Sequence, residues 1–210
     1  MIKELVLKNR SYRRFYEDRK ISTDTLKELV LKNRSYRRFY EDKKISMDTL
    51  KELVEIAHNT PSAANKQPLR YKLVNDEVGN DKVFECLGWA GYFKDWDGPL
   101  KGERPTGYVI MITKAGANSS WDEGIAGQTM LLAATQMGMG GCFIGNVDRE
   151  KLAKIIELPQ DMVIKLVIAF GYPKEEVVLE EISSDGDCKY YRDENQVHHV
   201  PKMRADDIII

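Results

Sequence analysis

The amino-acid sequence predicts a mixed α and β fold in one domain, preceded by a surplus N-terminal unit. Three observations support this prediction: a tandem repeat opens the chain, helix and strand patterns alternate irregularly after it, and no linker-like stretch divides them. With 42% hydrophobic and 31% charged residues and a formal net charge of −1, the composition is that of an ordinary globular chain.

The tandem repeat is the first element. Residues 3–26 and 27–50 differ only at Arg19/Lys43 and Thr23/Met47, and a third copy begins at Lys51 and soon breaks off. Solenoid folds need about three or more units to close a core, so this pattern indicates a duplication rather than a repeat architecture. Without one unit the chain has about 186 residues, a size typical of one domain. We therefore expect residues 1–26 to form an extra helical arm and residues 27–210 to form the domain.

Helix patterns account for much of the chain. A helix begins after the cap candidates Ser22 and Thr23 and runs without Gly or Pro across the junction between the two units. Residues 122–139 are apolar on most sides, which predicts a central buried helix. Further helices are predicted over residues 46–59, capped by Ser46, over 81–87, and over 148–156, capped by Asp148.

Strand patterns are fewer and more widely spaced. Residues 69–74 alternate in the manner of a strand, and 108–113 and 162–170 are apolar runs of strand length. Residues 88–105 are rich in Gly, Trp, Tyr and Pro, which predicts a long ordered loop. The last segment, 186–210, reads as a polar tail with a basic group near its end.

The charges are unevenly placed along the chain. Residues 1–54 hold 15 Lys and Arg against 9 Asp and Glu, whereas residues 55–210 hold 17 against 24. A basic end on an acidic chain is typical of a local anionic ligand, although a solvated helix face doubled by duplication explains it equally well.

No membrane segment or secretion signal is apparent in the sequence. No run approaches the ~18 apolar residues of a membrane helix, and the N-terminus lacks the apolar core of a signal peptide. Cys86, Cys142 and Cys188 are few, scattered and odd in number, which suits a reducing compartment. We expect a cytoplasmic protein with no membrane partner.

Four separated segments carry candidate chemistry. The basic segment 34–38 and the cations near residue 203 suit a phosphate, because guanidinium groups bind it through paired, charge-assisted hydrogen bonds. The segment 61–68 offers small residues and amides to the edge of a flat ligand, and the glycines of 138–145 allow close backbone approach. Each segment alone also fits a turn, a connection or a solubilising tail.

Side-chain catalysis and metal binding find little support. His198 and His199 are neighbours in an extended segment, so their side chains point to opposite faces, and no Cys or third His stands at ligand spacing. Cys142 has no evident partner His and is expected to be a small packing residue. We nominate no catalytic side chain and no metal site.

Taken together, the four segments resemble the FMN-dependent nitroreductase family over residues 27–210. The resemblance implies an α+β fold with a central, mostly antiparallel sheet flanked by helices, in an intertwined homodimer. It also implies an FMN cofactor, with the segment 34–39 and the C-terminal cations at the flavin phosphate. The residues that it assigns to the cofactor are Arg34, Ser35, Tyr36, Arg37, Ser62, Ala63, Asn65, Gln67, Gly140, Gly141, Cys142, Lys202 and Arg204.

The implied activity is that of an FMN-dependent NAD(P)H oxidoreductase. In this family the cofactor does the hard chemistry and the protein supplies orientation and polarity. The resemblance implies ping-pong hydride transfer from NADH or NADPH to an electron-poor acceptor such as a nitroaromatic or a quinone. It also implies that Ser62 and Asn65 reach the flavin of the other chain. Because 34–38 directly precedes the helix of 46–59, we expect the second copy of the motif, not Arg10–Arg14, to bind.

Two alternatives remain open from the sequence. The same fold with FMN also serves ene reduction, dehalogenation and flavin cleavage, which these residues barely separate from nitroreduction. In a different class, Arg interleaved with Tyr and Phe is typical of single-stranded nucleic-acid binders, and the duplication doubles this pattern. The Glu-Asp pair in each unit and the slightly acidic chain argue against nucleic acid.

Overall fold

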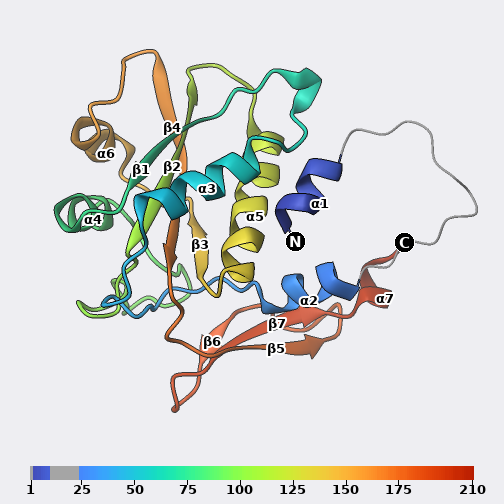
Figure 1. The fold of residues 1–210 in the computed structure, drawn as a ribbon. Coiled ribbons are helices and arrows are strands. Elements are labelled where there is room, and N and C mark those ends of the chain that lie inside the picture. Colours follow the sequence, from blue (N-terminus) through green and yellow to red (C-terminus); the bar gives the residue numbers. More distant parts are fainter. Residues whose placement is uncertain (1, 10–23) are drawn as a thin grey trace, which may run out of the picture.

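A computed structural model describes residues 2–9 and 24–210 of the chain. Its centre is a four-stranded sheet in the order β1-β2-β4-β3, and each neighbouring pair is antiparallel (Figure 1). The strands are β1 (Arg70–Val74), β2 (Gly107–Lys114), β3 (Gly140–Ile144) and β4 (Met162–Gly171). The predicted α+β fold with an antiparallel sheet is confirmed.

Helices cover both faces of this sheet (Figure 1). On one face lie α3 (Met47–Ala57) and α5 (Ser120–Gln136), and on the other lie α4 (Glu77–Phe84) and α6 (Arg149–Ile155). Successive side chains of β2 point alternately into the two helical layers, because strand residues alternate between the faces of a sheet. Val109 and Met111 join the core under α3 and α5, whereas Tyr108 and Ile110 join the one under α4 and α6.

The predicted helix starts agree with the structure at two caps. The Ser46 hydroxyl accepts a hydrogen bond from the Thr49 N–H at 3.0 Å, and the Asp148 carboxylate accepts one from the Lys151 N–H at 2.9 Å. Each bond satisfies a donor that the first helical turn would otherwise leave unpaired. The predicted central helix is α5, which buries eight of its residues.

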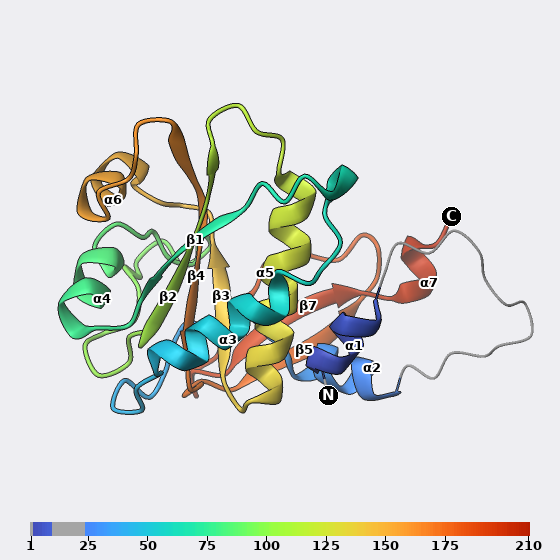
Figure 2. The same cartoon turned by 45° about the horizontal axis from the view of Figure 1, so that its top comes forward.

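Two short helices, α1 (Ile2–Lys8) and α2 (Asp24–Lys32), precede α3. Ile2 and Val6 of α1 are buried in the core cluster that α3 and α5 share, and the Ile2 N–H donates to Gln136 Oε1 at 2.5 Å. As predicted, α2 crosses the junction between the repeat units. Figures 1 and 2 both show α1 and α2 on the α5 side of the sheet. The predicted caps Ser22 and Thr23 lie outside the described residues.

The C-terminal segment forms a second sheet, of which the sequence predicted only an extended strand at His198 and His199 within a polar tail. Its order is β5-β7-β6, with β5 parallel and β6 antiparallel to β7. The strands are β5 (Val177–Ile182), β6 (Tyr191–Arg192) and β7 (His198–Met203), followed by α7 (Ala205–Ile208). In Figure 1 this sheet lies below α2. Within residues 2–9 and 24–210, no helix has the length and apolar character needed to cross a membrane.

Candidate functional site

The basic segment of the second repeat unit runs beside the glycine strand β3. Ser35 pairs with Gly141 in a parallel bridge, and the Tyr36 N–H donates to the Gly141 carbonyl at 3.1 Å. The segment therefore extends the edge of the main sheet by one short step. Two of the four predicted segments, far apart in the sequence, are joined through their backbones.

A cavity of about 230 Å³ opens where α2, α5, β3 and β7 meet. It contains three of the residues predicted to hold a phosphate, namely Arg34, Ser35 and Lys202. We call it the anion cavity. Its lining is Val30, Asn33, Arg34, Ser35, Gln128, Leu131, Phe143, Val200 and Lys202.

The charges in the anion cavity are incompletely paired. Arg34 Nη2 donates to the Val30 carbonyl, but the buried Arg34 Nε has no hydrogen-bond partner among the described residues. Burial lowers the pKa of Arg34, since the charged guanidinium loses hydration there. No carboxylate of the described ranges lies within ion-pair distance of Lys202. The buried Arg34 donor without a partner is costly, whereas Lys202 is exposed to solvent; an anion in this cavity would pair with both cations.

A second cavity, of about 200 Å³, shares Phe143 with the anion cavity in its lining. Arg37 faces this cavity rather than the anion cavity: its guanidinium lies 5.1 Å from the centre of the Tyr190 ring and donates to the Ser35 carbonyl at 3.2 Å. The rest of the lining is mainly small, with one aromatic residue, Trp89. It consists of Gly88, Trp89, Ala90, Gly91, Cys142, Ile144, Gly145 and Asn146.

The third arginine of the motif, Arg38, has a structural partner. Its Nε and Nη2 atoms bind the two Glu103 carboxylate oxygens at 2.6 and 2.8 Å, and Lys174 Nζ lies 2.9 Å from the same group. The Arg38 hydrogen bond, with help from Lys174, lowers the pKa of Glu103 to about 2. This bidentate pair fixes the loop to the body of the protein.

Two predicted glycines are required by the protein's own packing. A Cβ on Gly140 would lie 2.4 Å from the Tyr36 ring, and one on Gly141 would lie 2.2 Å from the Ala169 carbonyl oxygen. Close approach, which the sequence assigned to a ligand, is used here against the Tyr36 ring at Gly140 and between strands β3 and β4 at Gly141. The Cys142 thiol is fully buried and its pKa is raised to about 12 by that burial, so it packs as a neutral group.

The loop of residues 62–67 forms part of another cavity, of about 210 Å³, near the start of α5. The Ser62 hydroxyl accepts from the Gln67 N–H at 2.9 Å, and Asp122 of α5 accepts from the Ala63 N–H at 3.2 Å. Asn65 and Gln67 have φ angles of 54° and 47°. This left-handed backbone costs roughly 1–2 kcal/mol for each non-glycine residue, so the loop is held in a strained shape. Within one chain it does not line the anion cavity.

A model of the nitroreductase family matches residues 30–95 and 101–172, well over half of the chain. The chain belongs to the nitroreductase family. The resemblance noted in the sequence is thereby confirmed.

Individual relatives of this nitroreductase-family chain are distant. An Archaeoglobus fulgidus protein, provisionally named NADH dehydrogenase/NAD(P)H nitroreductase, is 26% identical over 125 residues, covering 55% of this chain and 67% of the relative. The iodotyrosine deiodinase of Thermotoga neapolitana is 23% identical over 139 residues, covering 58% of this chain and 75% of the relative.

Solved structures of the nitroreductase family share the fold. The FMN-dependent nitroreductase of Clostridium difficile R20291 has a TM-score of 0.57 at 21% identity, covering 70% of this chain and 87% of its own. A nitroreductase family protein of Streptococcus pneumoniae TIGR4 has a TM-score of 0.59 at 19% identity, covering 72% and 92%.

Arg204 is not brought to the anion cavity of this nitroreductase-family chain. Strand β7 ends at Met203, so the alternation that would place Arg204 beside Lys202 stops one residue early. Arg204 instead precedes α7 and binds Asp207, with Nε 3.0 Å from the carboxylate. Its predicted role at the phosphate stays a prediction.

Glu175 is a residue of this region that the sequence did not single out. Its buried carboxylate accepts hydrogen bonds from the backbone N–H groups of Arg37 and Arg38, and it pairs with Arg192 Nη2 at 2.9 Å. In the sequence it stands within a Lys-Glu-Glu run, a pattern typical of solvated surface. Only the tertiary fold, which closes the C-terminal sheet over it, distinguishes this glutamate from its neighbour.

Proposed function

We propose that the protein is an FMN-dependent NAD(P)H oxidoreductase. The observation that carries the proposal is the buried Arg34 Nε without a partner in a cavity that also holds Ser35 and Lys202. A dianionic phosphate would meet these donors, since charge-assisted hydrogen bonds are the strong ones. The residues present thus fit the phosphate of a flavin mononucleotide, within a family that includes an FMN-dependent nitroreductase.

The two cavities share Phe143 in their linings, and each would hold a different part of FMN. Arg34, Ser35 and Lys202 would hold the phosphate, while the second cavity beside β3, lined by small residues together with Trp89, Phe143 and Tyr190, would receive the flat ring end. When bound, FMN supplies two-electron chemistry between NADH or NADPH and an electron-poor acceptor such as a nitroaromatic or a quinone. Arg37 places a fixed positive charge at the ring cavity, where it would favour negative charge.

The function is assigned to residues 27–210, with residues 1–26 as an added helical arm. We further propose a homodimer, because the loop of Ser62 and Asn65 lies away from the anion cavity in its own chain. A second chain would bring this loop to the flavin. FMN affinity should then fall when the protein is diluted below its dimer constant, and an FMN-loaded monomer in sedimentation would contradict the dimer. The proposal requires neither nucleic acid nor a membrane as partner.

The decisive test is the visible absorption spectrum of purified protein supplemented with FMN and then desalted. We expect flavin bands that bleach without oxygen on addition of NADH or NADPH and return with a nitroaromatic or a quinone. Protein that retains no flavin would contradict the proposal. Arg34→Ala combined with Lys202→Ala should lose the bands at unchanged far-ultraviolet circular dichroism.

A second candidate reaction is reductive dehalogenation, which the Thermotoga neapolitana relative favours through its name, iodotyrosine deiodinase. The same flavin-loaded protein, reduced and mixed with an iodophenol, would release iodide if this reaction operates. Comparison of iodide release with nitro reduction, at equal enzyme and donor, separates the two acceptor classes.

A further inference from the structure

We propose that Glu175 is a positioning residue that keeps the two sides of the anion cavity in fixed positions relative to each other. The inference rests on the proposed function, because it assigns Glu175 a role in the grip on the flavin phosphate. One side of the cavity is the loop that carries Arg34 and Ser35, and the other is β7, which carries Lys202.

Glu175 is bonded directly to the loop side. Its Oε1 atom accepts hydrogen bonds from two successive backbone N–H groups, those of Arg37 and Arg38. Backbone acceptors of this kind fix the path of the loop itself rather than one side chain. The carboxylate is fully shielded from solvent, so water cannot replace these bonds.

The second oxygen of Glu175 is bonded to the C-terminal sheet. Its Oε2 atom lies 2.9 Å from Arg192 Nη2 on β6 and 3.8 Å from His198 Nδ1 on β7. Arg192 and His198 face each other in the β6–β7 register, and Lys202 follows four residues later on the same strand. A single buried carboxylate therefore links the loop and the strand that together supply the cations of the cavity.

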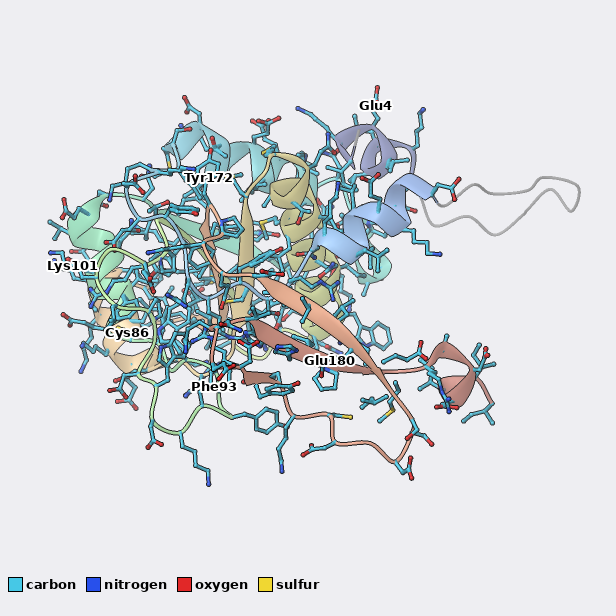
Figure 3. All side chains as sticks on the ribbon, turned by 90° about the horizontal axis from the view of Figure 1, so that it is seen from below. Glu4, Cys86, Phe93, Lys101, Tyr172 and Glu180 are labelled. Atoms are coloured by element: carbon cyan, nitrogen blue, oxygen red, sulfur yellow. The ribbon has the colours of Figure 1, made fainter. Side chains whose placement is uncertain are left out.

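Arg192 is itself held from the opposite side. Its guanidinium stacks over the rings of Phe93 and Trp96, at 5.0 and 4.4 Å from their centres. Figure 3 shows Phe93 on its loop beside the C-terminal sheet. The anchor of Glu175 is thus a packed cation with little freedom to follow a displaced partner.

The carboxylate is ionised in the folded protein. Burial alone would raise the pKa of Glu175, but the nearby His198 ring, the hydrogen bond from the Arg37 N–H and the charge of Arg192 outweigh it and lower the pKa. Glu175 is therefore a buried negative charge next to a cavity that would receive an anion. By charge alone, its removal would tighten binding of that anion.

A positioning role and a purely electrostatic role of Glu175 therefore predict opposite changes in FMN affinity when its side chain is removed. This difference makes the role testable. If Glu175 acts mainly by positioning, its removal lets the loop and β7 drift, and phosphate binding weakens despite the lost negative charge. The affinity for riboflavin, which lacks the phosphate, should fall far less. The ratio of FMN affinity to riboflavin affinity is a readout that general loosening of the fold would not move.

The experiment measures the dissociation constants of FMN and riboflavin with flavin-free protein. We expect Glu175→Ala to weaken FMN binding about 10- to 100-fold, as supporting residues of ligand sites commonly do, with a change of less than about threefold for riboflavin. Glu175→Gln, which keeps an oxygen acceptor for the loop, should weaken FMN less. The matched control is Glu180→Ala.

Glu180 is suited to this control because it joins the same C-terminal strands without touching the loop. It lies on β5 (Figure 3), where it binds His199 at 2.6 Å and Tyr191 at 2.9 Å. Its replacement should leave the FMN-to-riboflavin ratio within about threefold of wild type.

Several outcomes would overturn the inference. Tighter or unchanged FMN binding in Glu175→Ala would do so, and so would equal losses of FMN and riboflavin affinity. In either case, FMN binding by the wild-type protein would still support the proposed function. If Glu175→Ala does not fold, an unchanged ratio in Glu175→Gln would overturn the inference, and a lowered ratio would support it. Wild-type protein that binds neither flavin would end both proposals.

Discussion

Helices α1 and α2 contain the same six residues, Lys-Glu-Leu-Val-Leu-Lys, yet they bury different sides of this sequence. In α1 the valine, Val6, is 7% exposed and the preceding Leu5 is 42% exposed. In α2 the pattern is reversed, with Leu29 at 6% and Val30 at 44%. An identical sequence thus turns different sides, about 100° apart around the helix, toward the core within one chain.

The difference shows what the sequence leaves open. Leu-Val-Leu places apolar side chains at three successive helical positions, which span about 200° of the helix surface. Either the middle of this arc, as at Val6, or its first edge, as at Leu29, can face the core, so the neighbours decide. In α1, Ile2 precedes Val6 by one turn and favours that face, whereas in α2 the corresponding residue, Leu26, is itself 41% exposed.

The rotation of α2 has a consequence for the site. Because Leu29 faces the core, Val30 turns toward the anion cavity, and its carbonyl accepts a hydrogen bond from Arg34. The corresponding Val6 is packed in the core beside α3 and α5. The two copies are therefore unequal at this valine, one of the second-copy residues that line the cavity. The following experiments compare the two copies directly.

The largest expected difference concerns FMN. Arg34→Ala with Arg37→Ala should lower FMN affinity about 100-fold or more, because each charged hydrogen bond contributes roughly 1.5–3 kcal/mol. Arg10→Ala with Arg13→Ala, the equivalent change in the first copy, should leave the affinity unchanged. Titration of flavin-free protein with FMN measures both, and loss of binding only in the first-copy variant would reverse the assignment.

Substitutions of the equivalent leucines test the different orientations of α1 and α2 through the free energy of unfolding. Leu29→Ala should reduce the free energy of unfolding by about 2–4 kcal/mol, since it empties a buried position. Leu5→Ala, the same change in the other copy, should cost less than about 0.5 kcal/mol at its exposed position. Urea denaturation gives both values. Equal losses would mean that the two helices do not differ in this way.

Acid should weaken the attachment of the second copy at Arg38. The pKa of Glu103 is about 2 in the folded protein, below its ordinary value of 4.5. The stabilisation is therefore complete above about pH 4.5 and is lost as the pH falls toward 2. We expect roughly 1–3 kcal/mol less stability at pH 3 than at pH 7 from this group. Glu103→Gln should flatten that part of the pH profile, and an unchanged profile would contradict the pairing.

The valines should show the smallest effect, with the order of the copies reversed. Val6→Ala removes buried apolar surface and should cost about 1–1.5 kcal/mol. Val30→Ala, at the rim of the anion cavity, should cost less than about 0.5 kcal/mol. The same urea experiment applies, and a larger loss for Val30→Ala would contradict the orientation of α2.

Three strands of the main sheet and most of its helices were predictable because their signals are local, whereas β3 was not assigned as a strand and α4 begins four residues before its predicted start. Ser46 and Asp148 cap helices within a few residues, and the strands near 70, 110 and 166 are short alternating or apolar runs. The C-terminal sheet was not predictable in this way. Its pairing of Val177 with His198 joins short segments some twenty residues apart, of which β5 mixes apolar residues with Glu180 and Glu181 and β7 begins with two histidines.

The residues of the candidate site likewise fall into those that the sequence could identify and those that depend on contacts between distant parts of the chain. Arg34, Ser35 and Lys202 could be assigned from residue chemistry and family resemblance, and the structure places them in one cavity. The partner of Arg38 and the burial of Glu175 depend on contacts more than 60 residues apart in the chain. No local pattern encodes such contacts, so only the folded chain separates the cavity-facing arginines from the anchored one.

The most direct test of the central claim is a crystal structure of the flavin-loaded protein. We predict the FMN phosphate in the anion cavity, within hydrogen-bond distance of Arg34 and Lys202 and next to the Ser35 hydroxyl. A phosphate held by the first-copy residues Arg10–Arg14, or a flavin bound away from both cations, would contradict the account.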